Sequence, residues 1–151
     1  MEVDVEKLKR DWSGFEFDTA EFTIKPEDLV DFAAACGETD PRYTDPGHAD
    51  FQAVPSFTSR YVGRRVLPEH FPRIGTGFGF DAGKCVTVLG ALRAGDKIVA
   101  KSKIHDVYEK TGRSGQMVFI VHRMEFSNQR GEPVSIVDWR MVQTPGPGPA
   151  Q

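Results

Sequence analysis

Three side chains that could do chemistry lie close together near residue 40. Within the stretch Cys36–Asp45 lie the carboxylates of Glu38 and Asp40 and the phenol of Tyr43. A carboxylate can act as a general base or hold a water molecule, whereas a phenol, with an ordinary pKa of about 10, is a poor base at neutral pH. The stretch therefore predicts acid–base chemistry on a bound small molecule or, in the simpler interpretation, the capping of a helix end and a turn.

A predicted helix positions these side chains. Pro26 fits the first helical turn, and the two acidic residues after it are favourable at the positive end of the helix dipole. Apolar residues then recur at helical spacing, namely Leu29, Val30, Phe32, Ala33 and Cys36. Gly37 and Asp40-Pro41 end the helix, because a proline disfavours helical backbone at the residue before it. The carboxylates and the phenol should leave the helix end together.

The same stretch resembles the signature of the MaoC-like hydratases and dehydratases. In that signature a helix is followed by Gly or a small residue, Asp, any residue, Asn-Pro, any residue and His. Here the frame reads Gly37-Glu38-Thr39-Asp40-Pro41-Arg42-Tyr43. Glu38 replaces the catalytic Asp of the family, Asp40 its Asn, and Tyr43 its catalytic His. This pattern is similar to the N-terminal, dehydratase-like half of the family, which pairs with a catalytic half, and the resemblance extends from about Thr19 to Gln143.

The resemblance implies an α+β hot-dog fold, in which an antiparallel sheet wraps around a central helix. In an active member the Asp and His hold a water for addition to a 2-enoyl thioester, and a backbone N–H stabilises the enolate oxygen. Glu38, Asp40 and Tyr43 are then degenerate catalytic positions. The expected substrate-binding residues are Ser56, which lies where the family has its donor glycine, Phe57 beside it, and His48 in the preceding loop. The simpler role of Ser56 is to cap a helix.

The rest of the chain predicts one hot-dog domain at 15–143, an N-terminal arm at 1–14 and a disordered Pro/Gly tail at 144–151. The arm is expected to be either frayed or a short helix that docks on a partner. The central helix is expected from Ser56 to Leu67 and a covering loop from Thr44 to Val54. Alternating or β-branched runs separated by turn sequences predict strands at Glu21–Ile24, Lys84–Leu92, Lys97–Tyr108, Gln116–Ser127 and Pro133–Val142.

Composition excludes several classes of function. In the 151 residues, 19 Lys and Arg stand against 22 Asp and Glu, a formal net charge of -3, which gives no reason to expect nucleic acid or an anionic membrane as partner. Cys36 and Cys85 lack metal or redox spacing and are expected to be buried, reduced thiols. We expect no metal and no cofactor. The N-terminus does not read as a signal peptide, and no apolar run reaches about 20 residues, so the predicted location is the cytoplasm.

Our first functional hypothesis is a non-catalytic subunit of a 2-enoyl-thioester hydratase or 3-hydroxyacyl-thioester dehydratase. It would shape the acyl pocket for an acyl-CoA or acyl-carrier thioester beside an active MaoC-like partner. The imidazole base is missing, and the extra methylene of Glu38 misplaces its oxygens on a scale that can cost about 100-fold in rate. The alternatives are a self-sufficient enoyl-CoA hydratase using Glu38 with Asp40 or His48, a non-catalytic acyl-thioester-binding hot-dog protein, and a thioesterase. An open sheet edge predicts a homo- or hetero-oligomer.

Overall fold

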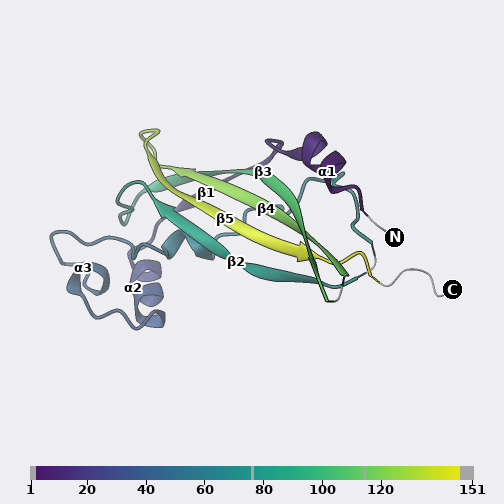
Figure 1. Ribbon diagram of the computed structural model, residues 1–151. Coiled ribbons are helices and arrows are strands. Elements are labelled where there is room, and N and C mark those ends of the chain that lie inside the picture. Colours follow the sequence, from purple (N-terminus) through teal and green to yellow (C-terminus); the bar gives the residue numbers. More distant parts are fainter. Residues whose placement is uncertain (1–2, 76, 114, 147–151) are drawn as a thin grey trace.

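A computed structural model describes residues 3–75, 77–113 and 115–146, and its architecture is α+β (Figure 1). One antiparallel sheet of five strands has the order β1-β3-β4-β5-β2. Its strands are β1 (Glu16–Thr23), β2 (Gly79–Val88), β3 (Lys97–Gly112), β4 (Gly115–Ser127) and β5 (Pro133–Gln143). The helices are α1 (Val5–Trp12), α2 (Pro26–Ala35), α3 (Pro41–Thr44) and the 3₁₀ turn η1 (Phe57–Arg60).

The strands β3, β4 and β5 confirm the predicted antiparallel meander. Their alternation also matches the prediction: Ile98, Ala100 and Ile104 are buried on one face of β3, whereas Lys101 is exposed on the other. The edge strands lie elsewhere than predicted. β1 begins at Glu16, earlier than the predicted Glu21, and pairs with β3.

The other edge strand, β2, begins at Gly79 instead of Lys84 and ends at Val88 instead of Leu92. A register shift between Asp81 and Lys84 lets the strand continue upstream along β5. The strand stops because the amides of Leu89 and Gly90 both donate to the carbonyl of Val134, which ends the regular ladder.

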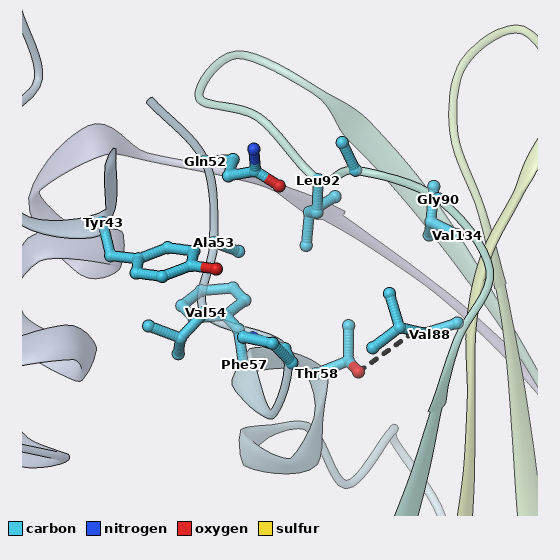
Figure 2. Close-up of a pocket in the computed structure, with 13 residues that line it drawn as sticks. Tyr43, Gln52, Ala53, Val54, Phe57, Thr58, Val88, Gly90, Leu92 and Val134 are labelled. Atoms are coloured by element: carbon cyan, nitrogen blue, oxygen red, sulfur yellow. Dashed lines mark hydrogen bonds between the residues drawn. The ribbon is translucent and has the colours of Figure 1, made fainter. Parts of the chain in front are cut away.

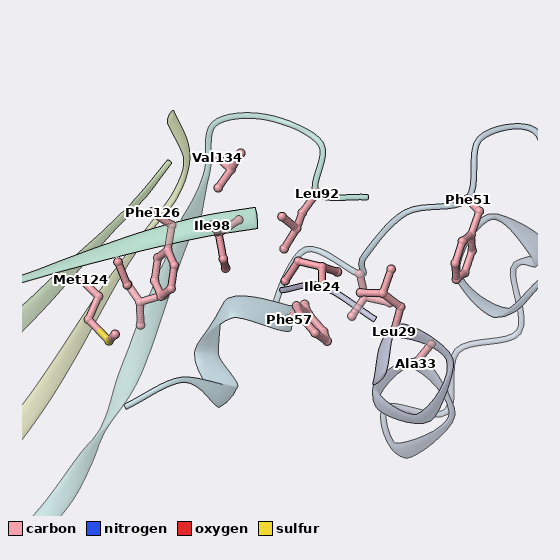
Figure 3. Close-up of a cluster of buried hydrophobic side chains, with 13 residues drawn as sticks. Ile24, Leu29, Ala33, Phe51, Phe57, Leu92, Ile98, Met124, Phe126 and Val134 are labelled. Carbon is pink, nitrogen blue, oxygen red and sulfur yellow. The ribbon is translucent and has the colours of Figure 1, made fainter. Parts of the chain in front are cut away.

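The inner face of the sheet carries the core in two clusters. α2, η1 and the loop between them cover one end (Figure 3). The buried members at this end are Ile24, Leu29, Ala33, Phe51, Val54, Phe57, Leu92, Ile98, Ala100, Met124, Phe126, Val134 and Val137. α1 covers the other end and buries Val5 and Leu8 there. Of the two predicted states of the N-terminal segment, the structure has a helix, and it packs on the sheet of its own chain.

The predicted helix from Ser56 to Leu67 is wrong in its extent, because only Phe57–Arg60 is helical. The first apolar residues of the predicted helix are buried as expected: Phe57 is 1% exposed, and Tyr61 packs against the core cluster that α2 and η1 cover. Val62 and Val66 instead face outward, at 39% and 38% exposure. Gly63 adopts a φ of 78°, which a helix does not contain, and this turns the chain away from helical geometry.

Two further expectations concern the cysteines and the tail. Cys36 and Cys85 are both exposed free thiols, so the prediction that they are buried is wrong. Cys36 is the C-cap residue of α2, beyond the buried stripe of the helix. Of the tail at 144–151, residues 147–151 lie outside the described residues. Among the described helices, none is long and apolar enough to cross a membrane.

Candidate functional site

The end of α2 places the two predicted carboxylates in a tight local structure. Gly37 has a φ of 73°, and the amide of Glu38 donates to the carbonyl of Ala33 at 2.9 Å. The Glu38 Oε1 then accepts from the amides of Thr39 and Asp40 at 2.9 and 3.0 Å. The Asp40 Oδ1 caps α3 by accepting from the amide of Arg42 at 2.9 Å. Both carboxylates therefore stabilise the turn between α2 and α3.

Tyr43 is the residue of the degenerate motif that reaches a pocket. Its half-buried side chain projects from α3, with the hydroxyl directed into the pocket (Figure 2). The pocket has a volume of about 90 Å³. Its walls are Tyr43, Gln52, Ala53, Val54, Pro55, Phe57, Thr58, Val88, Gly90, Ala91, Leu92, Val134 and Ser135. Loop, η1, the end of β2 and the start of β5 thus meet around one space.

The predicted substrate-binding residues divide between the pocket and the surface. Phe57 lines the pocket, with its ring 5.3 Å from that of Phe32 in an edge-to-face arrangement. His48 is exposed, and its Nδ1 accepts from the amide of Asp50 at 3.0 Å. Ser56 is exposed and occupies the predicted N-cap position of η1, but its side chain makes no capping hydrogen bond. Neither His48 nor Ser56 is among the residues that line the pocket.

Ion pairs hold the covering loop over the pocket. Asp50 binds Arg93 Nη2 at 2.8 Å and lies 3.3 Å from Arg42 Nε. The hydrogen bond from Arg93 and the two positive charges lower the pKa of Asp50 below its usual range. Arg93 also donates to the carbonyl of Phe51 at 3.2 Å, and the amide of Ala53 donates to the carbonyl of Leu92 at 2.8 Å. The predicted loop is therefore held in place as a wall of the pocket by its bonds to Arg42, Arg93 and Leu92.

Sequence patterns missed the polar pair on the floor of the pocket. The Ser135 hydroxyl donates to the Thr58 hydroxyl at 3.0 Å, although the two residues are 77 positions apart in the chain (Figure 2). Both side chains are buried. Neither residue lies in a recognisable motif. They meet only because η1 packs against β5. The pocket thus contains two hydroxyl groups, the phenol of Tyr43 and the amide of Gln52 in otherwise apolar walls.

The pocket opens beside a free edge of the sheet. β2 is the last strand in the sheet order, and Val88 at its end both lines the pocket and is 51% exposed. Leu89 next to it is 49% exposed, and Phe80 and Phe78 farther along are 53% and 85% exposed. Exposed apolar residues along an unpaired edge indicate an association surface.

Comparison with protein families finds one that spans most of the chain. The model described as "FAS1-like, dehydratase domain region" matches residues 11–137. A comparison with curated protein sequences finds no match.

Solved structures similar to this chain include a MaoC-like dehydratase and two complexes of two subunits. A MaoC-like dehydratase from Rhodospirillum rubrum has a TM-score of 0.62 and 20% identity, covering 90% of this chain and 94% of that one. The ChsH1-ChsH2 complex from Mycobacterium tuberculosis has a TM-score of 0.64 and 18% identity, with 95% and 90% covered. The HadBC (3R-hydroxyacyl-ACP dehydratase) complex of that organism has a TM-score of 0.64 and 19% identity, with 95% and 100% covered. At such identities these likenesses show the fold, which is the predicted hot dog.

Proposed function

Because this chain belongs to the family of FAS1-like dehydratase domain regions, in agreement with its MaoC-like signature, we propose that it is a non-catalytic half of a hydratase or dehydratase. It pairs with an active MaoC-like hot-dog subunit and shapes the acyl pocket of a complex that acts on 2-enoyl or 3-hydroxyacyl thioesters. The thioester is carried by coenzyme A or by an acyl carrier. The complex works in the cytoplasm, as the sequence predicts.

The chemistry of the pocket carries this proposal. Among the described residues that line it, none is a histidine, an aspartate or a glutamate, and Tyr43 is the only ionisable one. Hydration of an enoyl thioester needs a base within about 3 Å of the attacking water, at a suitable pKa. Glu38 and Asp40 instead hold backbone amides of the turn. The pocket therefore suits binding of an acyl group better than proton transfer.

The size of the pocket supports a partner. Ligand sites for drug-sized molecules commonly measure roughly 300–1,000 Å³. The pocket here has about 90 Å³, room for only part of an acyl thioester. Because Val88 belongs both to its wall and to the exposed β2 edge, a subunit docked on this edge would lie next to the pocket. A second subunit would then supply the remaining walls and the catalytic groups.

The β2 edge suits association better than the β1 edge. The β1 strand carries Glu16 and Glu21, charges that discourage pairing with another sheet, whereas the charges of β2, on Asp81 and Lys84, are bound by groups of the chain itself. The β2 edge presents the exposed apolar side chains Phe80 and Val88. The similar ChsH1-ChsH2 and HadBC structures are complexes of two named subunits, which agrees with a hetero-oligomer.

The alternative of a self-sufficient enoyl-CoA hydratase has less support. It would use Glu38 with Asp40 or His48 as its catalytic groups. His48 is exposed and outside the pocket wall, and the same Glu38 oxygen holds two amides. Reaching a bound thioester would require both carboxylates to leave the turn that they stabilise.

A matched pair of edge variants tests the proposal. The chain is co-expressed with a hot-dog subunit that carries an intact Gly-Asp-any-Asn-Pro-any-His motif, and the mass of the complex is measured by light scattering at micromolar concentration. Val88→Lys, on β2, should abolish the complex, because it buries a charge in the interface. Thr19→Lys, on the β1 edge, should leave it intact. A strictly monomeric wild-type chain in the presence of the subunit, or disruption by Thr19→Lys alone, would contradict the proposal.

A further inference from the structure

Two polar side chains buried on the inner face of the sheet have no hydrogen-bond partner. Ser102 on β3 and His122 on β4 are 1% and 0% exposed. In the described part of the chain the Ser102 Oγ and both ring nitrogens of His122 lack a partner with good hydrogen-bond geometry, although the Val66 backbone lies close enough to the imidazole to oppose the lowering of its pKa. A buried hydroxyl or imidazole left unsatisfied costs about 1–3 kcal/mol, so such groups call for an explanation.

Both side chains lie on neighbouring strands and on the same face of the sheet. In the ladder Ser102 pairs with Met124 and Ile104 pairs with His122, so the two polar residues are diagonal neighbours. Aromatic rings flank the imidazole: the ring centroids of Phe17 and Trp139 lie 5.0 and 6.2 Å from it. The polar pair therefore lies in largely apolar walls.

A segment without helix or strand covers the pair. Residues 61–75 are irregular, and connections of more than about 12–15 residues without secondary structure are usually functional. We call residues 61–67 the strap. A Cβ placed on Gly63 of the strap would lie 3.6 Å from Ser102 Oγ and 2.9 Å from Asp18 Oδ2. The strap backbone thus lies directly over Ser102, and a glycine is needed there.

The two ends of the strap, Tyr61 and Leu67, pack on the two core clusters, and side-chain hydrogen bonds hold the backbone between and before them. The Asp18 Oδ2 accepts from the amides of Arg64 and Arg65 at 2.7 and 3.2 Å. At its start, Lys84 Nζ donates to the carbonyls of Ser59 and Tyr61 at 2.7 and 3.3 Å. Between these two ends the strap leaves Val62 and Val66 exposed. This middle part is fixed by a few hydrogen bonds and buries little apolar surface, so it opens at a lower free-energy cost than the core strands.

The residue types of a hydrolytic triad meet here, but their geometry excludes one. Ser102 and His122 form no hydrogen bond with each other, and Asp18 binds the strap. Burial, together with the charge of Lys84, lowers the pKa of His122 to about 4. The imidazole is therefore neutral at pH 7 and offers one donor and one acceptor, and the serine hydroxyl offers both as well. Their complement is a neutral group that also donates and accepts.

We propose that the strap covers a second ligand site, in which Ser102 and His122 bind the hydroxyl group of an otherwise apolar molecule. This site is separate from the Tyr43 pocket and does not depend on the function proposed for that pocket. A groove of about 420 Å³ lies beside the strap, with Phe15, Phe17, Arg65 and Pro68 in its walls. Phe17 is both a wall of the groove and a neighbour of the His122 ring, so it lies between the groove and the imidazole. A ligand enters from the groove as Phe17 and the strap move aside.

The test uses the full chain, with p-cresol as a hydroxyl-bearing probe and toluene as its apolar match. Binding is followed by the imidazole nitrogen signals of His122 in nitrogen-15 NMR. We expect saturable shifts with p-cresol. Ser102→Ala should raise the Kd of p-cresol about fivefold, the worth of one net hydrogen bond, and change that of toluene less than twofold. Ser127→Ala, a serine near the end of β4, is the matched control and should change neither value.

A second variant separates the covered site from binding in the open groove. Asp18→Asn replaces a charged acceptor by a neutral one and should make the strap easier to open. The Kd of p-cresol should fall about fivefold, because the apparent affinity scales with the open fraction. The proposal is overturned if p-cresol leaves the His122 signals unchanged, as it would if the space held only water. It is also overturned if Ser102→Ala weakens both probes equally, or if Asp18→Asn does not tighten binding.

Discussion

His122 should make the folded chain lose stability as the pH falls below neutral. Folding buries its imidazole next to the charge of Lys84, while Asp18 on β1 and the Val66 backbone oppose this effect only in part. Its pKa falls from an ordinary 6.5 to about 4. Between these values the unfolded chain binds more protons than the folded one, so acid favours unfolding. The contribution of the neutral imidazole to the free energy of unfolding is therefore fully present above pH 6.5, and it is lost as the pH falls toward 4.

The size of this effect follows from proton linkage. Each pKa unit corresponds to about 1.4 kcal/mol, so the whole shift is worth about 3.4 kcal/mol once the pH is well below 4. Between pH 7.5 and pH 5.0 the loss in the free energy of unfolding is about 2 kcal/mol. This is a large fraction of the 5–15 kcal/mol that is typical of a whole domain.

Urea unfolding of the wild type and of His122→Phe at pH 7.5, 6.5, 5.5 and 5.0 measures the effect. The difference between the two curves cancels the other titrating groups, and the wild type should lose about 2 kcal/mol more than the variant over this range. His105→Gln, an exposed histidine on the outer face, should follow the wild type. Parallel curves for the wild type and His122→Phe would refute the reasoning, as would a wild type that gains stability relative to the variant in acid.

Three further substitutions test the packing and the turns. Phe57→Ala should lower the free energy of unfolding by about 3–5 kcal/mol in urea, whereas Phe80→Ala on the exposed edge should change it by about 0.5 kcal/mol or less; equal effects would contradict the assigned core. Asp138→Asn should lower the free energy of unfolding by about 1 kcal/mol in the same assay, because it weakens the partly buried, bidentate pair with Arg123, which has two 2.7 Å bonds. An unchanged free energy would show that this pair does not stabilise the fold. Gly63→Ala should lower the melting temperature more than Gly37→Ala, since both glycines have positive φ but only the first meets a neighbour, at 2.9 Å; the reverse order would contradict the strap geometry.

The sequence predicted those parts of the fold that short-range patterns encode. The helix from Pro26 ends at Ala35, as its apolar spacing and Gly37 indicated. The long strands β3 to β5 were predicted because each alternates in polarity and is bounded by a glycine-containing turn. The helix expected at Ser56–Leu67 was overextended, because the spacing of Val62 and Val66 matches a helix while Gly63 and Asp18 fix a different backbone.

The candidate site was predictable only in part. The motif located Tyr43, which lines the pocket, through its resemblance to the MaoC-like signature. The Thr58–Ser135 pair and the unsatisfied pair of Ser102 and His122 could not be predicted, because each depends on pairing between distant segments. A single sequence shows alternation along a strand, but it does not show which side chains meet across the sheet.

The dependence of activity on a partner tests the central proposal most directly. Hydration of crotonyl-CoA and of longer 2-enoyl-CoA thioesters is followed by absorbance with the purified chain alone, and then with its complex with a subunit that carries an intact motif. We predict no detectable turnover by the chain alone, turnover by the complex, and at most a twofold change in the complex when this chain carries Glu38→Gln or Tyr43→Phe. Loss of a positioned base typically costs 100- to 10,000-fold, so the two outcomes are well separated. Robust turnover by the chain alone that Glu38→Gln abolishes would contradict the proposal and identify a self-sufficient hydratase.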